Sequence, residues 1–178
     1  MPGPLSGDTM SIHSQSCSIG AYEFLFDFGR VYLICEKRME RTLRILQDFD
    51  YTGSATLCIT RLHPDLLQEK IPGRTVDSVW LSERVGQNNI PPNQLHRINQ
   101  RIASFLIGKK SAVILFDGIE YLCLFNDFLK VQMFLEQTND MIMASKAMML
   151  IPIDPVSLDP RSMAKIRRYA EVVDPNLG

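Results

Sequence analysis

The chain has 178 residues, enough for one domain with a sizeable hydrophobic core. Apolar residues make up 46% of it and charged residues 22%, which is ordinary for a soluble globular protein. The formal net charge of −1 excludes the strongly basic composition that favours nucleic acid or an anionic membrane as partner. The densest basic cluster, at 165–168, is interpreted as the solvated face of a helix rather than a binding patch.

Cysteine and histidine patterns argue against a metal site. No two of the four cysteines form a Cys-x-x-Cys pair and the three histidines are scattered, so the pattern predicts no zinc site and no cofactor. Cys35, Cys58 and Cys123 lie in apolar segments and are expected to be small core residues. Such cysteines suit a reducing compartment, and the chain has neither an apolar run of ~20 residues nor a secretory signal, so a cytoplasmic protein is expected.

The first 18 residues are small and polar and are interpreted as a disordered leader. Met1 and Met10 both remain as candidates for the start of translation. Neither a linker nor an internal repeat interrupts the rest, so residues 19–174 are expected to form a single domain.

Apolar strands and amphipathic helices alternate along this domain. Residues 21–26 are expected to form a short edge strand, and 30–35 a buried strand. Apolar residues recur at helical spacing over 39–49 and predict one face of a helix. The remaining predicted elements are, in chain order, strand 55–60, helix 64–70, strand 78–81, a polar loop at 86–92, helix 92–107, strand 112–116, a long helical region after Glu120, strand 147–152 and a helix from Asp159 to about 172.

The strands lack polar alternation, which is typical of strands buried on both faces. Their alternation with helices long enough to cross between them predicts an α/β fold, with a single doubly wound, mostly parallel five-stranded sheet and helices on both faces. The most informative segment is SAVILFDGIEYL at 111–122, where an apolar run stops on Asp117 and Gly118 and then continues as a helix.

Charged and polar side chains follow each predicted strand. The carboxyl ends of parallel strands meet at one edge of the sheet, where open α/β sheets place their binding crevices. The mixture of charge signs suits a site for phosphate, magnesium or a small molecule. Strand ends are also polar because they meet water, and a salt-bridge network at a buried edge has the same composition. For any single residue these structural explanations are favoured. The candidate ligand-binding residues are Glu36, Arg61, His63, Asp117, Glu120 and Asp154, and no catalytic or metal-binding residue is assigned.

Sequence motifs for nucleotide hydrolysis are absent. A phosphate loop needs glycines whose bare amides wrap the phosphates and a lysine that reaches them, but the first core strand is followed by EKRMERT at 36–42. Neither a dinucleotide-binding Gly-x-Gly-x-x-Gly nor the Gly-x-Ser-x-Gly elbow of acyl-transfer serines occurs. Ordinary ATP hydrolysis is therefore not expected.

Five motifs in order resemble a known family. They are VYLICE at 31–36, CITRLHP at 58–64, VWLS at 79–82, VILFDGIEYL at 113–122 and LIPIDP at 150–155. Together they resemble the prokaryotic domain of unknown function 835, over roughly residues 30–159. That resemblance implies a domain that stands alone or follows sensory modules such as PAS domains in signalling proteins, with no established activity.

The strand order is also similar to that of nucleotide hydrolases of the RecA/KaiC type. That resemblance implies that Asp117 matches their magnesium-holding acid and that Asp154 follows the sensor strand. The missing phosphate loop departs from their pattern.

These observations predict a non-catalytic α/β module, not an enzyme, that works in signal transduction or regulation through contacts with a protein partner or sensory module. A homodimer is compatible with this expectation, and nucleic-acid and membrane partners are not expected. The alternative is a degenerate ATPase that binds a nucleotide or phosphate ligand at Arg61, Asp117, Glu120 and Asp154. A metal-dependent hydrolase using the last three of these residues is a weaker third hypothesis.

Overall fold

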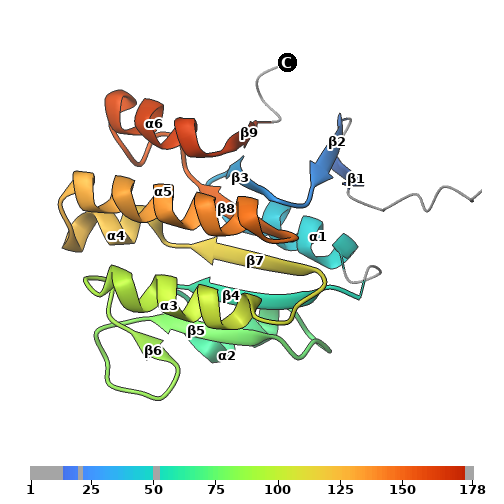
Figure 1. Ribbon diagram of the computed structural model, residues 1–178, viewed down its shortest axis with the longest axis horizontal. Helices are drawn as coiled ribbons and strands as arrows, with labels where there is room; N and C mark the ends of the chain where they lie inside the picture. The colour runs from blue at the N-terminus through green and yellow to red at the C-terminus, as the bar shows by residue number, and fades with distance from the viewer. Residues whose placement is uncertain (1–13, 20–21, 50–52, 175–178) are drawn as a thin grey trace, which may run out of the picture.

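The computed structural model describes residues 14–19, 22–49 and 53–174 (Figure 1). Its main sheet has seven strands in the order β6-β5-β4-β7-β8-β3-β9, and every pairing in it is parallel. The strands are β3 (Arg30–Cys35), β4 (Ala55–Thr60), β5 (Asp77–Leu81), β6 (Asn89–Ile90), β7 (Ala112–Asp117), β8 (Ala147–Ile153) and β9 (Glu171–Val173).

The unbroken apolar runs form the middle of the sheet, as expected. β7 is the central strand, and all six of its residues are buried. Its neighbour β8 is buried over all seven residues. Side chains of alternate residues enter opposite hydrophobic layers, so no position in these strands tolerates a solvated side chain. The predicted α/β class with a parallel sheet is confirmed.

The predicted number of strands is wrong, because the sheet has seven strands rather than five. The strands β6 and β9 extend its two edges and have two and three residues, too few to produce a periodic apolar signal. The predicted edge strand at 21–26 corresponds to β2 (Tyr22–Asp27), which pairs antiparallel with β1 (Ser14–Ile19) in a separate two-stranded sheet. Residues 14–18 of the expected leader therefore belong to β1, and its residues 1–13 lie outside the described residues.

Helices cover both faces of the sheet, as predicted. One hydrophobic layer contains α1 (Glu40–Asp48) and α2 (Pro64–Lys70). The other contains α3 (Leu95–Leu106), α4 (Ile119–Phe125), α5 (Phe128–Ala144) and α6 (Pro160–Ile166), the last of which continues into the 3-10 helix η2 (Arg167–Tyr169).

The long helical region predicted after Glu120 is interrupted at Asn126. This residue has an extended backbone, and its side-chain amide donates to the carbonyl oxygens of Leu122 and Pro92, each at 2.9 Å. Those two bonds tie the end of α4 to the loop before α3 and redirect the chain into α5. The last predicted helix is also shorter than expected, because the chain turns into β9 before residue 172.

The order of connections places two crevices at the carboxyl edge of the sheet. After β3 the chain passes to α1 on one face, whereas after the neighbouring β8 it passes to α6 on the other. The same divergence separates β4, which leads to α2, from its neighbour β7, which leads to α4. Such switch points are where open α/β sheets bind ligands. In the described part of the chain, no helix has the length and apolar character needed to cross a membrane.

Candidate functional site

A cavity of about 320 Å³ lies at this carboxyl edge, over the ends of β3, β4, β7 and β8. It spans both switch points. Its walls consist of the segment that links β3 to α1, the residues that follow β4 and β7, the last residue of α2 and the end of β8. The lining residues are Glu36, Lys37, Arg38, Met39, Arg61, Leu62, Lys70, Asp117, Glu120, Pro152, Ile153 and Asp154.

Five of the six candidate residues line this cavity, and His63 does not. The His63 ring caps α2 instead, since its Nδ1 accepts a hydrogen bond of 3.2 Å from the amide of Asp65. Its edge rests against the ring of Trp80, with the ring centres 4.9 Å apart. His63 follows a strand, which predicts its backbone position, whereas its side chain has a local role at the start of α2.

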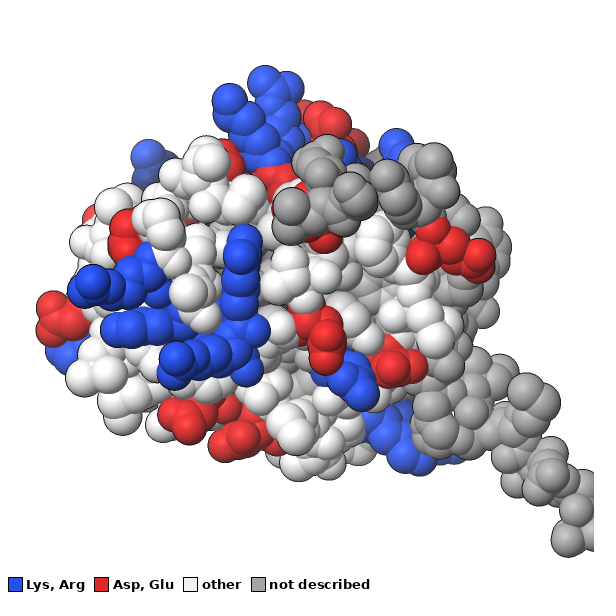
Figure 2. Space-filling view, turned by 90° about the horizontal axis from the view of Figure 1, so that it is seen from above, with Lys and Arg blue, Asp and Glu red and all other residues white. Residues whose placement is uncertain are grey.

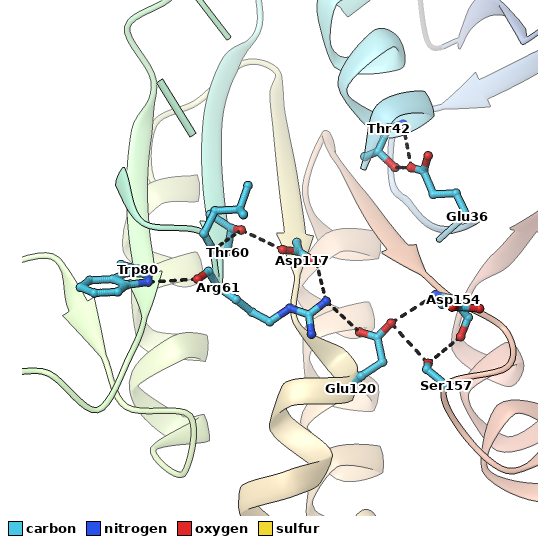
Figure 3. Close-up of polar contacts among 10 residues, drawn as sticks. Glu36, Thr42, Thr60, Arg61, Trp80, Asp117, Glu120, Asp154 and Ser157 are labelled. Atoms are coloured by element: carbon cyan, nitrogen blue, oxygen red, sulfur yellow. Dashed lines mark hydrogen bonds and ion pairs between the residues drawn. The ribbon is translucent and has the colours of Figure 1, made fainter. Parts of the chain in front are cut away.

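Glu36 serves as the cap of α1 (Figure 3). Its carboxylate accepts hydrogen bonds from the amides of Arg41 at 2.8 Å and Thr42 at 2.9 Å, and from the Thr42 hydroxyl. The residue at the usual capping position, Met39, makes no side-chain bond to the helix. The first amides of a helix attract anions, and after the first core strand of a nucleotide hydrolase such amides hold phosphate. In this chain a carboxylate of the protein occupies them.

Asp117 lies at the end of β7 and has two partners. Its Oδ2 accepts a hydrogen bond of 2.8 Å from the Thr60 hydroxyl, and its Oδ1 is 3.5 Å from Nη2 of Arg61. The Arg61 backbone is held by two bonds, one from its own amide to the Asp117 carbonyl and one from the Trp80 indole to the Arg61 carbonyl. These bonds hold the Arg61 backbone next to the end of β7, and the guanidinium lies beside the Asp117 carboxylate.

Glu120 connects Arg61 to the loop after β8 (Figure 3). Its Oε1 accepts bonds from the Asp154 amide at 3.2 Å and the Ser157 hydroxyl at 3.4 Å. Its Oε2 is fully buried, lacks a hydrogen bond within the described residues, and is 3.9 Å from Nη2 of Arg61. The Asp154 carboxylate turns away to accept the amide of Val156 at 3.2 Å. Arg61 thus lies between Asp117 and Glu120 and balances one of their two negative charges.

The cysteine thiols of Cys35, Cys58 and Cys123 are not activated as nucleophiles. Burial raises the pKa of Cys58 to about 12 and also raises the pKa of Cys35 above its ordinary value. Near Glu120, burial raises the pKa of Cys123 to about 11, and the negative charge of Glu120 adds to the effect. A thiolate is the reactive form, so none of these three groups is suited to nucleophilic catalysis at neutral pH.

Three cations that line the cavity are not among the six candidate residues. Lys37 and Arg38 directly follow Glu36, and their position after a strand was a usable signal. Lys70 ends α2 and reaches the cavity only through the tertiary fold, so no local pattern marks it. Among the residues that the structure describes, no group of three or more His, Cys, Asp or Glu side chains is arranged to hold a metal ion.

None of the residues of the basic cluster near the end of the chain lines this cavity. Figure 2 shows Lys and Arg side chains gathered at the end of the molecule where α6 lies. Arg161, Arg167 and Arg168 are exposed, while Lys165 is half-buried with its amine 5.8 Å from the centre of the Phe128 ring. Within the described ranges none of these four forms an ion pair, as expected for a solvated surface.

Similarity to solved structures is confined to the fold. A Pyrococcus horikoshii OT3 protein studied as project PH0250 has a TM-score of 0.55 and 10% identity, with 85% of each chain covered. FlaH, a flagellar accessory protein of Methanocaldococcus jannaschii, has a TM-score of 0.55 and 15% identity, with 80% of this chain and 69% of FlaH covered. The KaiC-like protein PH0186 of P. horikoshii OT3 has a TM-score of 0.56 and 16% identity, with 82% of this chain and 71% of that protein covered.

The predicted RecA/KaiC-like architecture is therefore confirmed. No curated protein matches the sequence. The profile of one family, described as "Protein of unknown function (DUF835)", matches residues 35–169, which is more than half of the chain. The chain belongs to this DUF835 family.

Proposed function

We propose that this domain is a non-hydrolysing α/β module that works in signal transduction or regulation through contacts with another protein. The observation that carries the proposal is the position of the Glu36 carboxylate on the amides of Arg41 and Thr42. A phosphate at these amides would have to displace a charged group that is covalently part of the chain, and it would meet that group's negative charge.

The acids beside the cavity support the same conclusion. Asp117 and Glu120 both contact Nη2 of Arg61, so a cation of the protein already lies at the place between them that a metal ion would need. Hydrolysis in the RecA/KaiC-type enzymes needs a magnesium-holding acid together with a phosphate cradle. In this chain internal contacts occupy both places, and Asp117 and Glu36 have structural roles that explain their positions without catalysis.

A surface suited to protein contact lies where α4 meets α5. Leu124 is 79% exposed and Phe125 37% exposed at the end of α4, and Leu129 is 65% and Met133 51% exposed on α5. Leu129 and Met133 are four residues apart and therefore share the outer face of their helix. Large exposed apolar side chains that share a helix face favour association with another protein.

Affinity capture tests the protein-contact part of the proposal. The chain is used as bait in a lysate of its source organism, beside a variant with Leu129→Asp and Met133→Asp. The matched control is Ile107→Asp, because Ile107 is also exposed, at 77%, but follows α3. We expect a stoichiometric partner that is retained by the control and lost from the double variant. If the double variant still binds the partner, the assignment of this surface is refuted. If the parent chain captures no partner, the proposed role is refuted.

A further inference from the structure

The cavity at the carboxyl edge has free positive charge. Lys37 and Arg38 enter it from the segment before α1, and Lys70 enters from the end of α2. All three residues are exposed. In the described part of the chain, none of their side chains forms a hydrogen bond or ion pair.

The negative charge of the same cavity is already engaged. The Glu36 carboxylate is held by two backbone amides and a hydroxyl. Asp117 and Glu120 share Arg61, and the Asp154 carboxylate accepts a backbone amide. The lining thus carries four cations and four acids, but the acids already have partners within the protein. Among the described residues, Lys37, Arg38 and Lys70 are therefore the charged groups left to bind a ligand.

We propose that this cavity binds a small phosphate-bearing anion, of the size of inorganic phosphate or pyrophosphate, through Lys37, Arg38 and Lys70. Charge-assisted hydrogen bonds to phosphate oxygens suit both the forked guanidinium and the compact ammonium group. A phosphate group offers three oxygens, which matches three separate cations better than a singly charged carboxylate does. The volume of about 320 Å³ is at the small end of ligand pockets, for which ~300–1,000 Å³ is typical.

The location in the fold supports this assignment independently of the charges. The cavity lies across the switch points between β3 and β8 and between β4 and β7. Binding at such a crevice follows from the way the connections diverge and requires no particular sequence motif. The bound anion would join the β3–α1 segment to the end of α2, two parts of the chain that no described ion pair links.

This site differs from a phosphate loop in its donors. Side-chain cations hold the anion, whereas the first amides of α1 remain with Glu36. Because Arg61 stays with Asp117 and Glu120, binding requires no magnesium. The inference goes beyond the proposed function and does not depend on it, since anion binding and protein contact are measured separately.

Isothermal titration of the intact chain with pyrophosphate and with phosphate, at constant ionic strength and without magnesium, tests the proposal. We expect saturable binding of one anion per chain. Variants Lys37→Ala with Arg38→Ala, and Lys70→Gln alone, should each weaken binding at least tenfold. The matched control, Arg161→Ala with Arg168→Ala, removes two exposed cations of α6 and η2 that do not line the cavity and should change affinity less than twofold.

Three results would overturn the proposal. One is the absence of saturable binding by the parent chain. Another is an equal loss of affinity in the α6 control, which would assign the effect to general surface charge. The third is tight binding of adenosine or AMP that pyrophosphate does not compete with. That result would show that the cavity recognises the nucleobase rather than the phosphate group. Circular dichroism confirms the fold of each variant, and Lys70→Gln keeps the test decisive if the double variant unfolds.

Discussion

Removal of the Glu36 carboxylate is the most informative single change in this fold. In Glu36→Ala the amides of Arg41 and Thr42 lose their acceptor, and the buried Thr42 hydroxyl loses its partner. Loss of a helix cap costs ~0.5–2 kcal/mol, and loss of a charge favourable to the helix dipole costs ~0.3–1 kcal/mol. We expect the free energy of unfolding to fall by about 2 kcal/mol, which for a chain of this length lowers Tm by roughly 4–8 °C.

Urea unfolding and calorimetry measure this loss. Glu40→Ala is the matched control, because Glu40 is an exposed acid in the first turn of α1 whose side chain makes no hydrogen bond in the described part of the chain. The control should lose only the dipole contribution, below ~1 kcal/mol. Glu36→Gln keeps an acceptor oxygen and should lie between the two. Equal destabilisation by Glu36→Ala and Glu40→Ala would refute the assignment of Glu36 as a cap.

Three further predictions concern the strand ends and the core. Gly118→Ala should lower the free energy of unfolding by ~1–3 kcal/mol in urea titrations, because Gly118 has a φ of +155° and its Cβ would lie 2.8 Å from Cδ1 of Leu81; a loss below 0.5 kcal/mol would contradict this. Asp117→Ala should lower the free energy of unfolding by ~1–3 kcal/mol, because it removes the acceptor of the Thr60 hydroxyl. Asp117→Asn keeps an acceptor oxygen and should lower that free energy clearly less. Equal destabilisation by the two variants would refute the structural role of this hydrogen bond. Iodoacetamide at pH 8 should label Cys58 only after unfolding, because burial raises its pKa to about 12 and little thiolate forms in the folded chain. Mass spectrometry measures the labelling of Cys58. Rapid labelling of Cys58 in the native protein would contradict this prediction.

The interior of the sheet was predictable from the sequence because long apolar runs have one physical explanation. A segment such as 112–117 or 147–153 avoids water only between two hydrophobic layers. The edge strands β6 and β9 were missed because two or three residues have no periodicity. The break between α4 and α5 was missed because it depends on two hydrogen bonds from Asn126, one of which reaches the distant Pro92 carbonyl.

For the cavity, chain order predicted which residues approach the edge but not what their side chains do there. Glu36 and Asp117 follow strands and were selected for that reason, yet neither the cap formed by Glu36 nor the Thr60 bond of Asp117 has a sequence signature. His63 illustrates the converse, since its ring turns toward Trp80. Lys70 was missed because the end of α2 meets the cavity only after the helix has packed on the sheet.

Phosphate release from Mg²⁺-ATP tests the central claim, that the protein's own side chains occupy the positions needed for hydrolysis. The intact chain and Asp117→Asn are incubated with Mg²⁺-ATP, and inorganic phosphate is followed to less than one turnover per hour. Glu36 occupies the amides of α1 and Arg61 lies beside Asp117. We therefore predict that both the intact chain and Asp117→Asn release phosphate no faster than buffer alone. Phosphate release by the intact chain that Asp117→Asn abolishes would contradict the account.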